Sequence, residues 1–362
     1  MSSPGSDLPA IRGHVPALDG LRGLAIVMVI AYHAGAFKWG WIGVDLFFVL
    51  SGYLITNVLL ESKTDPRFFR NFYARRTLRI FPLYYLFVGL TLLNRVLVHD
   101  GTPGGWWALI FMINWRVVLV HDWHSIPNGL GHLWTLAIEE QFYLLWPLLV
   151  RTMTRSALSR LCVFVAVFTL CMRVLIIVPV WNLEPFSTWQ YNAVYVSTPT
   201  RIDSLLIGAW FALRPAGAAR APRYALPVAL AAIAALFMGG TEPMLEPEIA
   251  SFGFSLVAVT AVLALQAALY DGLVARICRA PLLQAVGRRS YAMYLFHLAV
   301  IAMLSDLGMR AGLLTGIVAG AVVYGVAEIT WRTIEAPALS LKRYFPRGGT
   351  GRNSGPPVIA AG

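Results

Sequence analysis

Residues 18–35 read LDGLRGLAIVMVIAYHAG, an apolar stretch long enough to cross a membrane that carries Arg22 near its start and His33 near its end. At about 100° and 1.5 Å per residue, these two side chains differ by about 20° around a helix and lie roughly 16 Å apart along it. Ionisable side chains in a membrane helix are costly unless they face a bundle interior or a wet cavity. The shared face of Arg22 and His33 therefore predicts a functional site.

The composition places the rest of the chain in the membrane as well. Of its 362 residues, 58% are hydrophobic and 13% are charged, with a mean hydropathy of +0.65, whereas a soluble domain has roughly a quarter of its residues charged. The net charge of +11 comes mostly from short loops between apolar stretches, which is the positive-inside pattern and needs no nucleic-acid partner. The three cysteines are an odd number and indicate free thiols and no disulfide framework, and the sequence shows no metal-ligand cluster and no phosphate-cradling P-loop. We expect an all-α polytopic membrane protein whose first partner is the lipid bilayer.

The alternation of apolar stretches and basic loops predicts about ten transmembrane helices. They fall at residues 18–35, 41–60, 80–98, 132–150, 161–180, 199–213, 224–240, 249–269, 290–307 and 311–331. Residues 106–131 are expected to form one re-entrant or interfacial helix, because only an even number of crossings can join the two basic loops that flank this region. Both termini then lie in the cytoplasm and the protein in the inner, or plasma, membrane. Residues 1–17 are a cytoplasmic lead, 18–340 the transmembrane domain and 341–362 a disordered cytoplasmic tail.

Five polar groups interrupt the apolar stretches. Besides Arg22 and His33 they are residues 75–79 (RRTLR), 132–143 (HLWTLAIEEQFY), 201–204 (RIDS) and 288–297 (RRSYAMYLFH). A polar side chain inside a membrane bundle is either a site residue or a packing contact between helices. Both roles stay open for three of them, Arg201, Asp203 and His297, and the first two could pair with each other or with another helix.

In these residues the sequence resembles the integral-membrane acyltransferase family 3, the O-acyltransferases that modify surface polysaccharides and some secreted small molecules. The family shows an LDGLRGLA opening with an arginine and a histidine at this spacing, a GVDLFFVLSG helix, an R-x-x-R pair before a proline, and W-S-L-x-x-E-x-Q-F-Y and S-Y-x-x-Y-L-x-H elements. All occur here in family order over about residues 17–340, with Thr135 in place of the usual serine. The resemblance implies ten spans, O-acyltransferase activity and a set of supporting residues: Trp134, Tyr143, Tyr291, Tyr294 and His297.

O-acylation from a thioester needs a base for the hydroxyl proton and donors for the developing oxyanion. His33 suits the base, because imidazole titrates near neutral pH. Glu139 or Glu140 could orient His33 and stabilise its imidazolium, as the third group of a catalytic triad does. The two carboxylates point about 100° apart on a helix, and Glu139 shares a face with His132 and Tyr143. We therefore expect Glu139 to face the site.

The basic run suits an acyl-CoA co-substrate, most simply acetyl-CoA, with no permanently bound cofactor. Arg75, Arg76 and Arg79 lie at the expected cytoplasmic surface, where guanidinium groups can bind the CoA phosphates in bidentate fashion. The family motif favours Arg76 and Arg79. The face that joins Arg22 to His33 would then line a path along which the pantetheine arm delivers the acyl group outwards.

These inferences predict a membrane O-acyltransferase that moves an acyl group from cytoplasmic acyl-CoA to a hydroxyl of a carbohydrate or of a secondary metabolite, with His33, Glu139 and Arg22 as catalytic residues. One alternative is a polytopic transporter whose buried His/Arg/Glu relay performs no covalent chemistry. Inverted repeats with paired broken helices would favour the transporter, and the sequence shows none. Another alternative is an assembly subunit of an envelope-synthesis complex, in which the polar residues only hold helices together.

Overall fold

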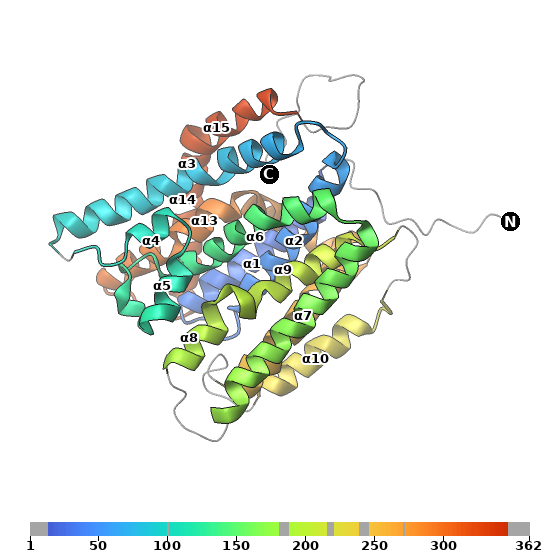
Figure 1. Ribbon diagram of the computed structural model, residues 1–362. Helices are drawn as coiled ribbons and strands as arrows, with labels where there is room; N and C mark the ends of the chain where they lie inside the picture. Colours follow the sequence, from blue (N-terminus) through green and yellow to red (C-terminus); the bar gives the residue numbers. More distant parts are fainter. Residues whose placement is uncertain are drawn as a thin grey trace.

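The computed structural model describes residues 14–99, 101–180, 188–215, 221–238, 246–270 and 272–346. Within these ranges the chain forms helices and no strand, which confirms the expected all-α class. The first helix, α1 (Pro16–His33), lies in the middle of the bundle (Figure 1). It packs against four other long helices, namely α2 (Ile42–Ser62), α11 (Phe254–Leu269), α13 (Pro281–Asp306) and α14 (Leu313–Thr330).

The remaining elements surround this centre. In chain order they are α3 (Phe68–Leu97), α4 (Trp106–Leu109), α5 (Ile113–Val120), the 3-10 turns η1 (Trp123–Ser125) and η2 (Gly131–Leu133), α6 (Trp134–Thr152), α7 (Arg155–Ile177), the 3-10 turn η3 (Val178–Val180), α8 (Thr188–Val196), α9 (Thr198–Ala212), α10 (Ala225–Phe237), the π-helical turn η4 (Ile249–Gly253), α12 (Leu273–Cys278), the π-helical turn η5 (Trp331–Glu335), α15 (Ala336–Ser340) and the 3-10 turn η6 (Leu341–Tyr344). Helices α3 and α15 run along one edge of the bundle, and α7 and α10 along another (Figure 1).

Five helical stretches are long and apolar enough to cross a membrane, as judged by length and composition: Ile42–Ser62, Phe68–Leu97, Arg155–Ile177, Ile249–Leu269 and Leu313–Tyr344. Each overlaps a span expected from the sequence, so the protein is a multi-pass membrane protein. The other expected crossings either contain more polar residues, as α1 and α6 do, or are shorter helices, as α9 and α10 are. The total of about ten crossings stays a prediction.

Three helices begin earlier than the apolar stretches that predicted them. Helix α3 begins at Phe68 and not at residue 80, α7 at Arg155 and not at 161, and α13 at Pro281 and not at 290. Hydropathy marks where a helix enters the apolar layer, whereas its end groups decide where backbone hydrogen bonding starts. The Thr154 side chain accepts a hydrogen bond from the Ala157 N–H at 3.2 Å and so caps α7, and a proline occupies the first turn of α13.

The segment 106–131 contains only short helices. Helix α5 has eight residues and so extends roughly 12 Å at 1.5 Å per residue, against about 30 Å for the hydrocarbon layer. No helix described in this segment can cross a membrane alone, in keeping with the expected re-entrant or interfacial element. Gln141 of α6 holds the segment, because its Nε2 donates to the Phe111 carbonyl at 2.9 Å and to Asn114 Oδ1 at 3.1 Å.

The C-terminal tail is ordered further than expected. Residues 341–344 form η6, and Arg75 of α3 donates to the carbonyl groups of Lys342 at 3.2 Å and Phe345 at 2.8 Å. The expectation of disorder from residue 341 was therefore wrong for the start of that range, because a side chain distant in sequence satisfies its carbonyl groups. The expectations for residues 1–13 and 347–362 lie outside the described residues.

Glycines allow two pairs of helices to touch at backbone distance. A Cβ atom added to Gly208 of α9 would lie 2.0 Å from the Val49 carbonyl oxygen of α2, and one added to Gly287 of α13 would lie 1.7 Å from the Asp19 carbonyl oxygen of α1. Close approach at small residues is a common way for membrane helices to associate. These crossings fix α9 against α2 and α13 against α1, and these helices together carry half of the expected site residues.

Substituting Gly208 with alanine should destabilise the bundle by about 1–3 kcal/mol, because α2 and α9 must separate to admit the methyl group. Gly320→Ala in α14 is the matched control, since no atom lies within 4 Å of the added Cβ there. That control should be neutral or stabilise by about 0.5–1 kcal/mol through its better helix propensity. Thermal unfolding of the two purified variants in detergent measures both stability changes. Equal melting temperatures for the two variants would contradict the close crossing of α2 and α9.

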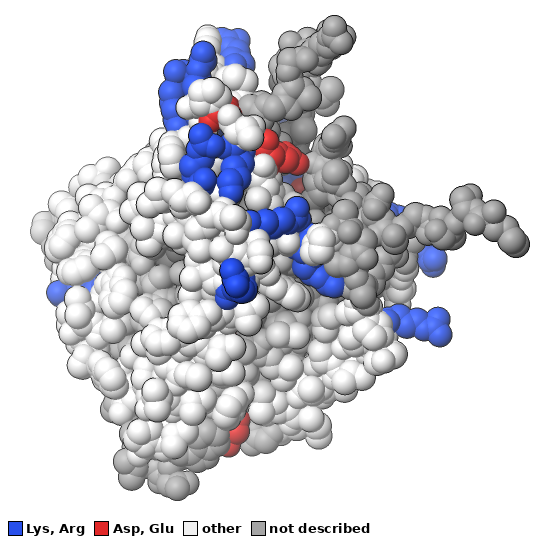
Figure 2. All heavy atoms as spheres, turned by 45° about the vertical axis from the view of Figure 1, so that its right-hand side comes forward, with Lys and Arg blue, Asp and Glu red and all other residues white. Residues whose placement is uncertain are grey.

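The basic residues gather at one end of the bundle. Figure 2 shows Lys and Arg side chains over the upper and right-hand part of the face in view and few over its lower part. Lys63 Nζ donates to the Met153 carbonyl at 2.6 Å, and Arg155 Nε donates to the Leu213 carbonyl at 2.9 Å. The ends of α2, α6 and α9 and the start of α7 therefore meet at this basic end.

Candidate functional site

His33 is the last residue of α1 and is exposed, at the end of the bundle opposite the basic end. Its ring lies against the buried ring of His297 in α13, with the ring centroids 4.9 Å apart. His33 Nδ1 is 2.9 Å from the Val29 carbonyl oxygen and 3.3 Å from His297 Nε2. His297 Nδ1 is in turn 2.6 Å from the Tyr294 carbonyl oxygen. The tertiary structure thus joins two histidines from opposite ends of the sequence into a hydrogen-bonded pair.

These contacts decide which ring nitrogen carries the proton. A carbonyl oxygen only accepts hydrogen bonds, so Nδ1 of His33 and Nδ1 of His297 must each carry a hydrogen. In the neutral rings both Nε2 atoms are then acceptors. His297 Nε2 accepts from the His33 Nδ1–H, which Val29 shares. His33 Nε2 keeps its lone pair and has no hydrogen-bond partner in the described part of the chain.

A third histidine lies in the wall beside this pair. The His132 ring is 5.2 Å from that of His297, and its Nε2 donates to a backbone carbonyl of α13 at 3.1 Å. The Tyr294 hydroxyl lies 3.0 Å from the His132 carbonyl oxygen and 2.6 Å from Thr135 Oγ1. Thr135, the departure from the family serine, therefore keeps a hydroxyl in contact with an expected supporting residue.

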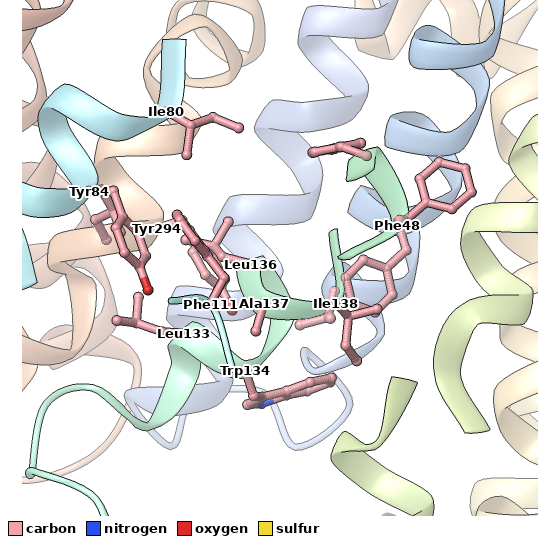
Figure 3. Close-up of a cluster of buried hydrophobic side chains, with 14 of the residues drawn as sticks. Phe48, Ile80, Tyr84, Phe111, Leu133, Trp134, Leu136, Ala137, Ile138 and Tyr294 are labelled. Atoms are coloured by element: carbon pink, nitrogen blue, oxygen red, sulfur yellow. The ribbon is translucent and has the colours of Figure 1, made fainter. Parts of the chain in front are cut away.

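Apolar side chains hold these polar groups in place. Figure 3 shows the buried cluster around Tyr294 and the start of α6, with side chains that come from α2, α3, α6 and α13. Its members Phe48, Tyr84 and Leu133 are at most 1% exposed. Since such cores are packed as tightly as organic crystals, the polar side chains beside them have little room to rearrange.

A second polar cluster lies toward the basic end. Arg22 of α1 is within electrostatic range of Arg76 and Glu139, and Arg79 is within range of Arg22 and Arg76. The Arg76 guanidinium carbon is 3.9 Å from the centroid of the Tyr143 ring, which is a cation–π contact. Arg76 and Arg79 are on α3 and not in the loop expected for the basic run, and their spacing of three places both on one helix face.

Glu139 lies in this arginine cluster and not beside His33. In the described part of the chain, the His33 ring hydrogen-bonds to a backbone carbonyl and to His297, and neither carboxylate is among its partners. The expected orientation of His33 by Glu139 or Glu140 is therefore not what the structure contains. The reason is the position of Glu139 along the bundle: it is within electrostatic range of Arg76 and of Arg22, and Arg22 is roughly 16 Å along α1 from His33.

Glu140 and Tyr143 belong to the same cluster. The Tyr143 hydroxyl hydrogen-bonds to Ser51 of α2, and Glu140 is within electrostatic range of Arg76. Glu140 Oε1 is buried and has no hydrogen-bond partner among the residues that the structure describes. A buried polar atom without a partner is uncommon, and one reason for it is a functional role.

Arg75 differs from Arg76 and Arg79 in its contacts. Its guanidinium donates to the carbonyls of Lys342 and Phe345, which ties the segment after α15 to α3. Of the three arginines expected to bind the acyl carrier, Arg76 and Arg79 lie with Arg22, whereas Arg75 has a structural contact.

Arg201 and Asp203 pair with other helices and not with each other. Arg201 Nη2 donates to both carboxylate oxygens of Asp45 in α2 at 3.0 Å, and Arg173 Nη2 of α7 donates to Asp203 at 2.7 Å. All four side chains are at most 1% exposed. We call Asp45, Arg173, Arg201 and Asp203 the buried charge quartet. It connects α2, α7 and α9 with equal numbers of positive and negative groups.

Neither Asp45 nor Arg173 was expected from the sequence as a site residue, and Arg173 is the one that sequence reasoning could have found. It stands alone among apolar residues in the expected span 161–180, and the argument that singled out Arg22 applies to it equally. Besides Asp203, it donates to the carbonyls of Thr200 at 2.6 Å and Ser251 at 3.2 Å. A search for any lone charge in an apolar span, in place of known motifs, would have found it.

The two remaining expected residues tie helices together near the site. Tyr291 donates to the Ile80 carbonyl at 2.8 Å and so links α13 to α3. The Trp134 ring lies 5.8 Å from the Arg201 guanidinium carbon and 5.0 Å from the Tyr195 ring. Trp134, the first residue of α6, therefore connects the start of this helix to the buried charge quartet.

Fold and site together define a polytopic helical membrane protein with an arginine–carboxylate cluster toward its basic end and an exposed histidine at the other. A family model described as "Acyltransferase domain" matches residues 15–331, so the chain belongs to this acyltransferase family. This is the acyltransferase family 3 that the sequence motifs resemble.

The chain is also similar to several curated proteins. YrhL of Bacillus subtilis strain 168, provisionally named a peptidoglycan O-acetyltransferase, is 33% identical over 317 residues, which cover 80% of this chain and 49% of YrhL. The peptidoglycan O-acetyltransferase OatA of Listeria monocytogenes EGD-e is 29% identical over 357 residues, covering 90% and 56%. The O-acetyltransferase OatA of Staphylococcus aureus NCTC 8325 is 29% identical over 356 residues, covering 90% and 57%. The chain spans about half the length of these relatives, and no solved structure matches it.

Proposed function

We propose that this protein is a membrane O-acetyltransferase that moves an acetyl group from acetyl-CoA to a hydroxyl of a carbohydrate, with His33 as general base. The observation that carries the proposal is the exposed His33 ring, whose Nδ1 is held by Val29 and His297 while its Nε2 lone pair is free. A base needs this arrangement of a fixed ring with an accessible unprotonated nitrogen. Membership of the acyltransferase family supplies the reaction class.

The reaction needs one proton carrier. His33 Nε2 takes the proton of the acceptor hydroxyl as its oxygen attacks the thioester carbonyl. The tetrahedral intermediate then expels the CoA thiolate, which takes the same proton back from the imidazolium. An ester and free CoA–SH are formed, and the enzyme returns to its starting state.

The acyl carrier is proposed to bind at the arginine cluster. Arg22, Arg76 and Arg79 bring three cationic groups within range of one another, which suits the phosphate groups of CoA. These arginines lie toward the basic end, assigned to the cytoplasm, where acyl-CoA is available. The roughly 16 Å of α1 between Arg22 and His33 would be bridged by the pantetheine arm, so the acetyl group would cross the membrane within the protein. We place both termini in the cytoplasm and the protein in the inner, or plasma, membrane.

The acceptor is proposed to be a cell-envelope glycan. The three relatives are named O-acetyltransferases, and two of these names specify peptidoglycan. A secondary-metabolite acceptor stays the second choice within the same chemistry. No observation on the fold or site favours the transporter alternative, and the assembly-subunit alternative would make His33 dispensable for catalysis.

The test is acetyl transfer by the purified protein in nanodiscs, which expose both faces of the membrane. Radiolabelled acetyl-CoA is supplied with peptidoglycan fragments or with mixed envelope glycans, and label is followed into the glycan and into released CoA–SH. Transfer by the wild type is expected. A protein that transfers no label from any acyl-CoA but binds a small solute tightly would be a transporter.

Substitution of Arg76 tests the carrier site. Arg76→Ala should raise the KM for acetyl-CoA about 10- to 100-fold, because charged hydrogen bonds contribute about 1.5–3 kcal/mol each. Arg76→Lys should recover part of the affinity, since lysine keeps the charge and loses the bidentate geometry. Arg160→Ala is the matched control, an exposed arginine near the same end. Initial rates at varied acetyl-CoA measure the effect, and equal KM values for Arg76→Ala and Arg160→Ala would refute the assignment.

A further inference from the structure

The group that holds His33 in place is another histidine. In a catalytic triad this position belongs to a carboxylate, which fixes the imidazole and stabilises its charged form. The two carboxylates of the W-x-x-x-x-E-E segment are engaged at the arginine cluster instead. His297 Nε2, at 3.3 Å from His33 Nδ1, is the side-chain hydrogen-bond partner of the His33 ring in the described residues.

We propose that His297 is the positioning residue of the proposed reaction, acting on His33 through a neutral imidazole–imidazole hydrogen bond. This inference rests on the proposed function for its catalytic meaning. The structure supplies the arrangement itself: His297 donates Nδ1–H to the Tyr294 carbonyl, which leaves its Nε2 lone pair directed at His33 Nδ1–H.

The Tyr294 carbonyl sets the direction of the hydrogen bond. If His297 Nε2 carried a hydrogen and donated it to His33, then His33 Nδ1 would have to be unprotonated. A lone pair at that atom would face the Val29 carbonyl oxygen at 2.9 Å, which is repulsive. Two carbonyl groups, one on α1 and one on α13, therefore select the same direction, with His33 as donor and His297 as acceptor.

This direction of the hydrogen bond, from His33 to His297, suits the proposed role of His33 as general base. When His33 Nε2 accepts the hydroxyl proton, the positive charge spreads over the ring and strengthens the Nδ1–H bond to its acceptors. His297 is 0% exposed and its ring contacts those of Tyr294 and His132, so it cannot turn away as the charge forms. His33 itself is exposed. The buried His297 ring thus provides a rigid support, and the exposed His33 ring is the one that takes the proton.

Position 297 offers a conservative variant that separates this role from packing. A glutamine side chain places its amide oxygen near the position of histidine Nε2, so His297→Gln keeps an acceptor for His33. His297→Leu keeps much of the volume and removes the acceptor. His132→Gln is the matched control, because His132 packs on the His297 ring but hydrogen-bonds to a backbone carbonyl and not to His33.

The first readout is the kinetics of acetyl transfer in nanodiscs. His297→Leu should lower kcat about 10- to 100-fold with KM for acetyl-CoA within about twofold, a smaller loss than the 10⁴-fold seen when a triad carboxylate is replaced. His297→Gln should keep most of the wild-type kcat, and His132→Gln should lose less than His297→Leu. Equal rates for His297→Leu and the wild type, or equal losses in the Gln and Leu variants of His297 when both are folded, would overturn the proposal.

The second readout needs no acetyltransferase activity. Diethyl pyrocarbonate adds an ethoxycarbonyl group to an unprotonated imidazole nitrogen and releases ethanol and carbon dioxide, and mass spectrometry locates the modified ring. His33 should react through Nε2 severalfold more slowly in His297→Leu than in the wild type or in His297→Gln. The exposed His121 and His124 serve as internal references in the same digest.

The two readouts distinguish a failure of the proposed function from a failure of the positioning role of His297. A wild type that transfers no acetyl would refute the proposed function, while the modification rate of His33 would still decide whether His297 activates it. A His33 rate that is equal in all variants, relative to His121 and His124, would refute the positioning role whatever the kinetics show.

Discussion

His33→Ala should lower acetyl transfer about 10²- to 10⁴-fold, the range that a positioned general base contributes. The physical reason is that His33 Nε2 is the free lone pair of an imidazole whose other nitrogen is tied to Val29 and His297. Because the side chain is exposed at the end of α1, its removal creates no buried cavity and should leave the bundle folded. The loss should therefore fall on kcat, with little change in the melting temperature.

The measurement compares initial rates of label transfer for wild type and variant in nanodiscs. His124→Ala is the matched control, because it removes an exposed histidine from the segment 106–131. Full transfer by His33→Ala at normal expression would show that another group is the base. A loss of folded protein equal to the loss of activity would instead favour the assembly-subunit role, in which polar residues only hold helices together.

Asp45→Ala should produce the largest loss of stability, about 3–5 kcal/mol. Arg201 is 1% exposed and Asp45 is its carboxylate partner, so the variant leaves a buried guanidinium unpaired. Two other atoms of Arg201, Nε and Nη1, already have no hydrogen-bond partner among the described residues. The guanidinium also stacks 3.7 Å from the Phe254 ring centroid and cannot move to water without disrupting that packing.

The measurement is the free energy of unfolding in a denaturing-detergent titration of the purified protein. Asp306→Ala removes an exposed carboxylate from the end of α13 and should change stability by less than about 0.5 kcal/mol. The double variant Asp45→Leu with Arg201→Met should recover much of the loss, because replacing both members of a buried pair by apolar groups is often neutral. An unchanged stability in Asp45→Ala would show that water reaches Arg201 and that the pair is not buried in solution.

Several features of the fold could be predicted from hydropathy and charge. The all-α membrane class follows from apolar stretches that alternate with basic loops, and the positions of α1 and α2 agree with the predicted spans within two residues. The starts of α3, α7 and α13 could not be predicted this way, because hydropathy marks the lipid boundary while capping and helix propensity extend the helix beyond it. The even number of crossings required between the two flanking basic loops was the useful signal for the segment 106–131, which contains the short helices α4 and α5.

Within the site, local spacing predicted what lies on one helix and failed where two helices must meet. Arg76 and Arg79 on α3, and Glu139 and Tyr143 on α6, share faces as their spacing implies. The same reasoning could not say which helices pack against the Glu139 face of α6, and so it assigned Glu139 to His33 when the arginines within its electrostatic range are Arg76 and Arg22.

The amino-acid sequence was enough to establish that this protein is a helical membrane protein of the acyltransferase family, and to place Arg22 and His33 on one face of its first helix. These are properties of composition, motif and helical period, which depend only on residues near one another in the chain. The tertiary structure alone decided that His297 holds His33, that Arg173 pairs with Asp203, and that Arg201 pairs with Asp45. The reason is physical: a buried charge or ring nitrogen takes whichever partner the helix crossings bring within about 3 Å, and those crossings depend on the packing of all the helices at once.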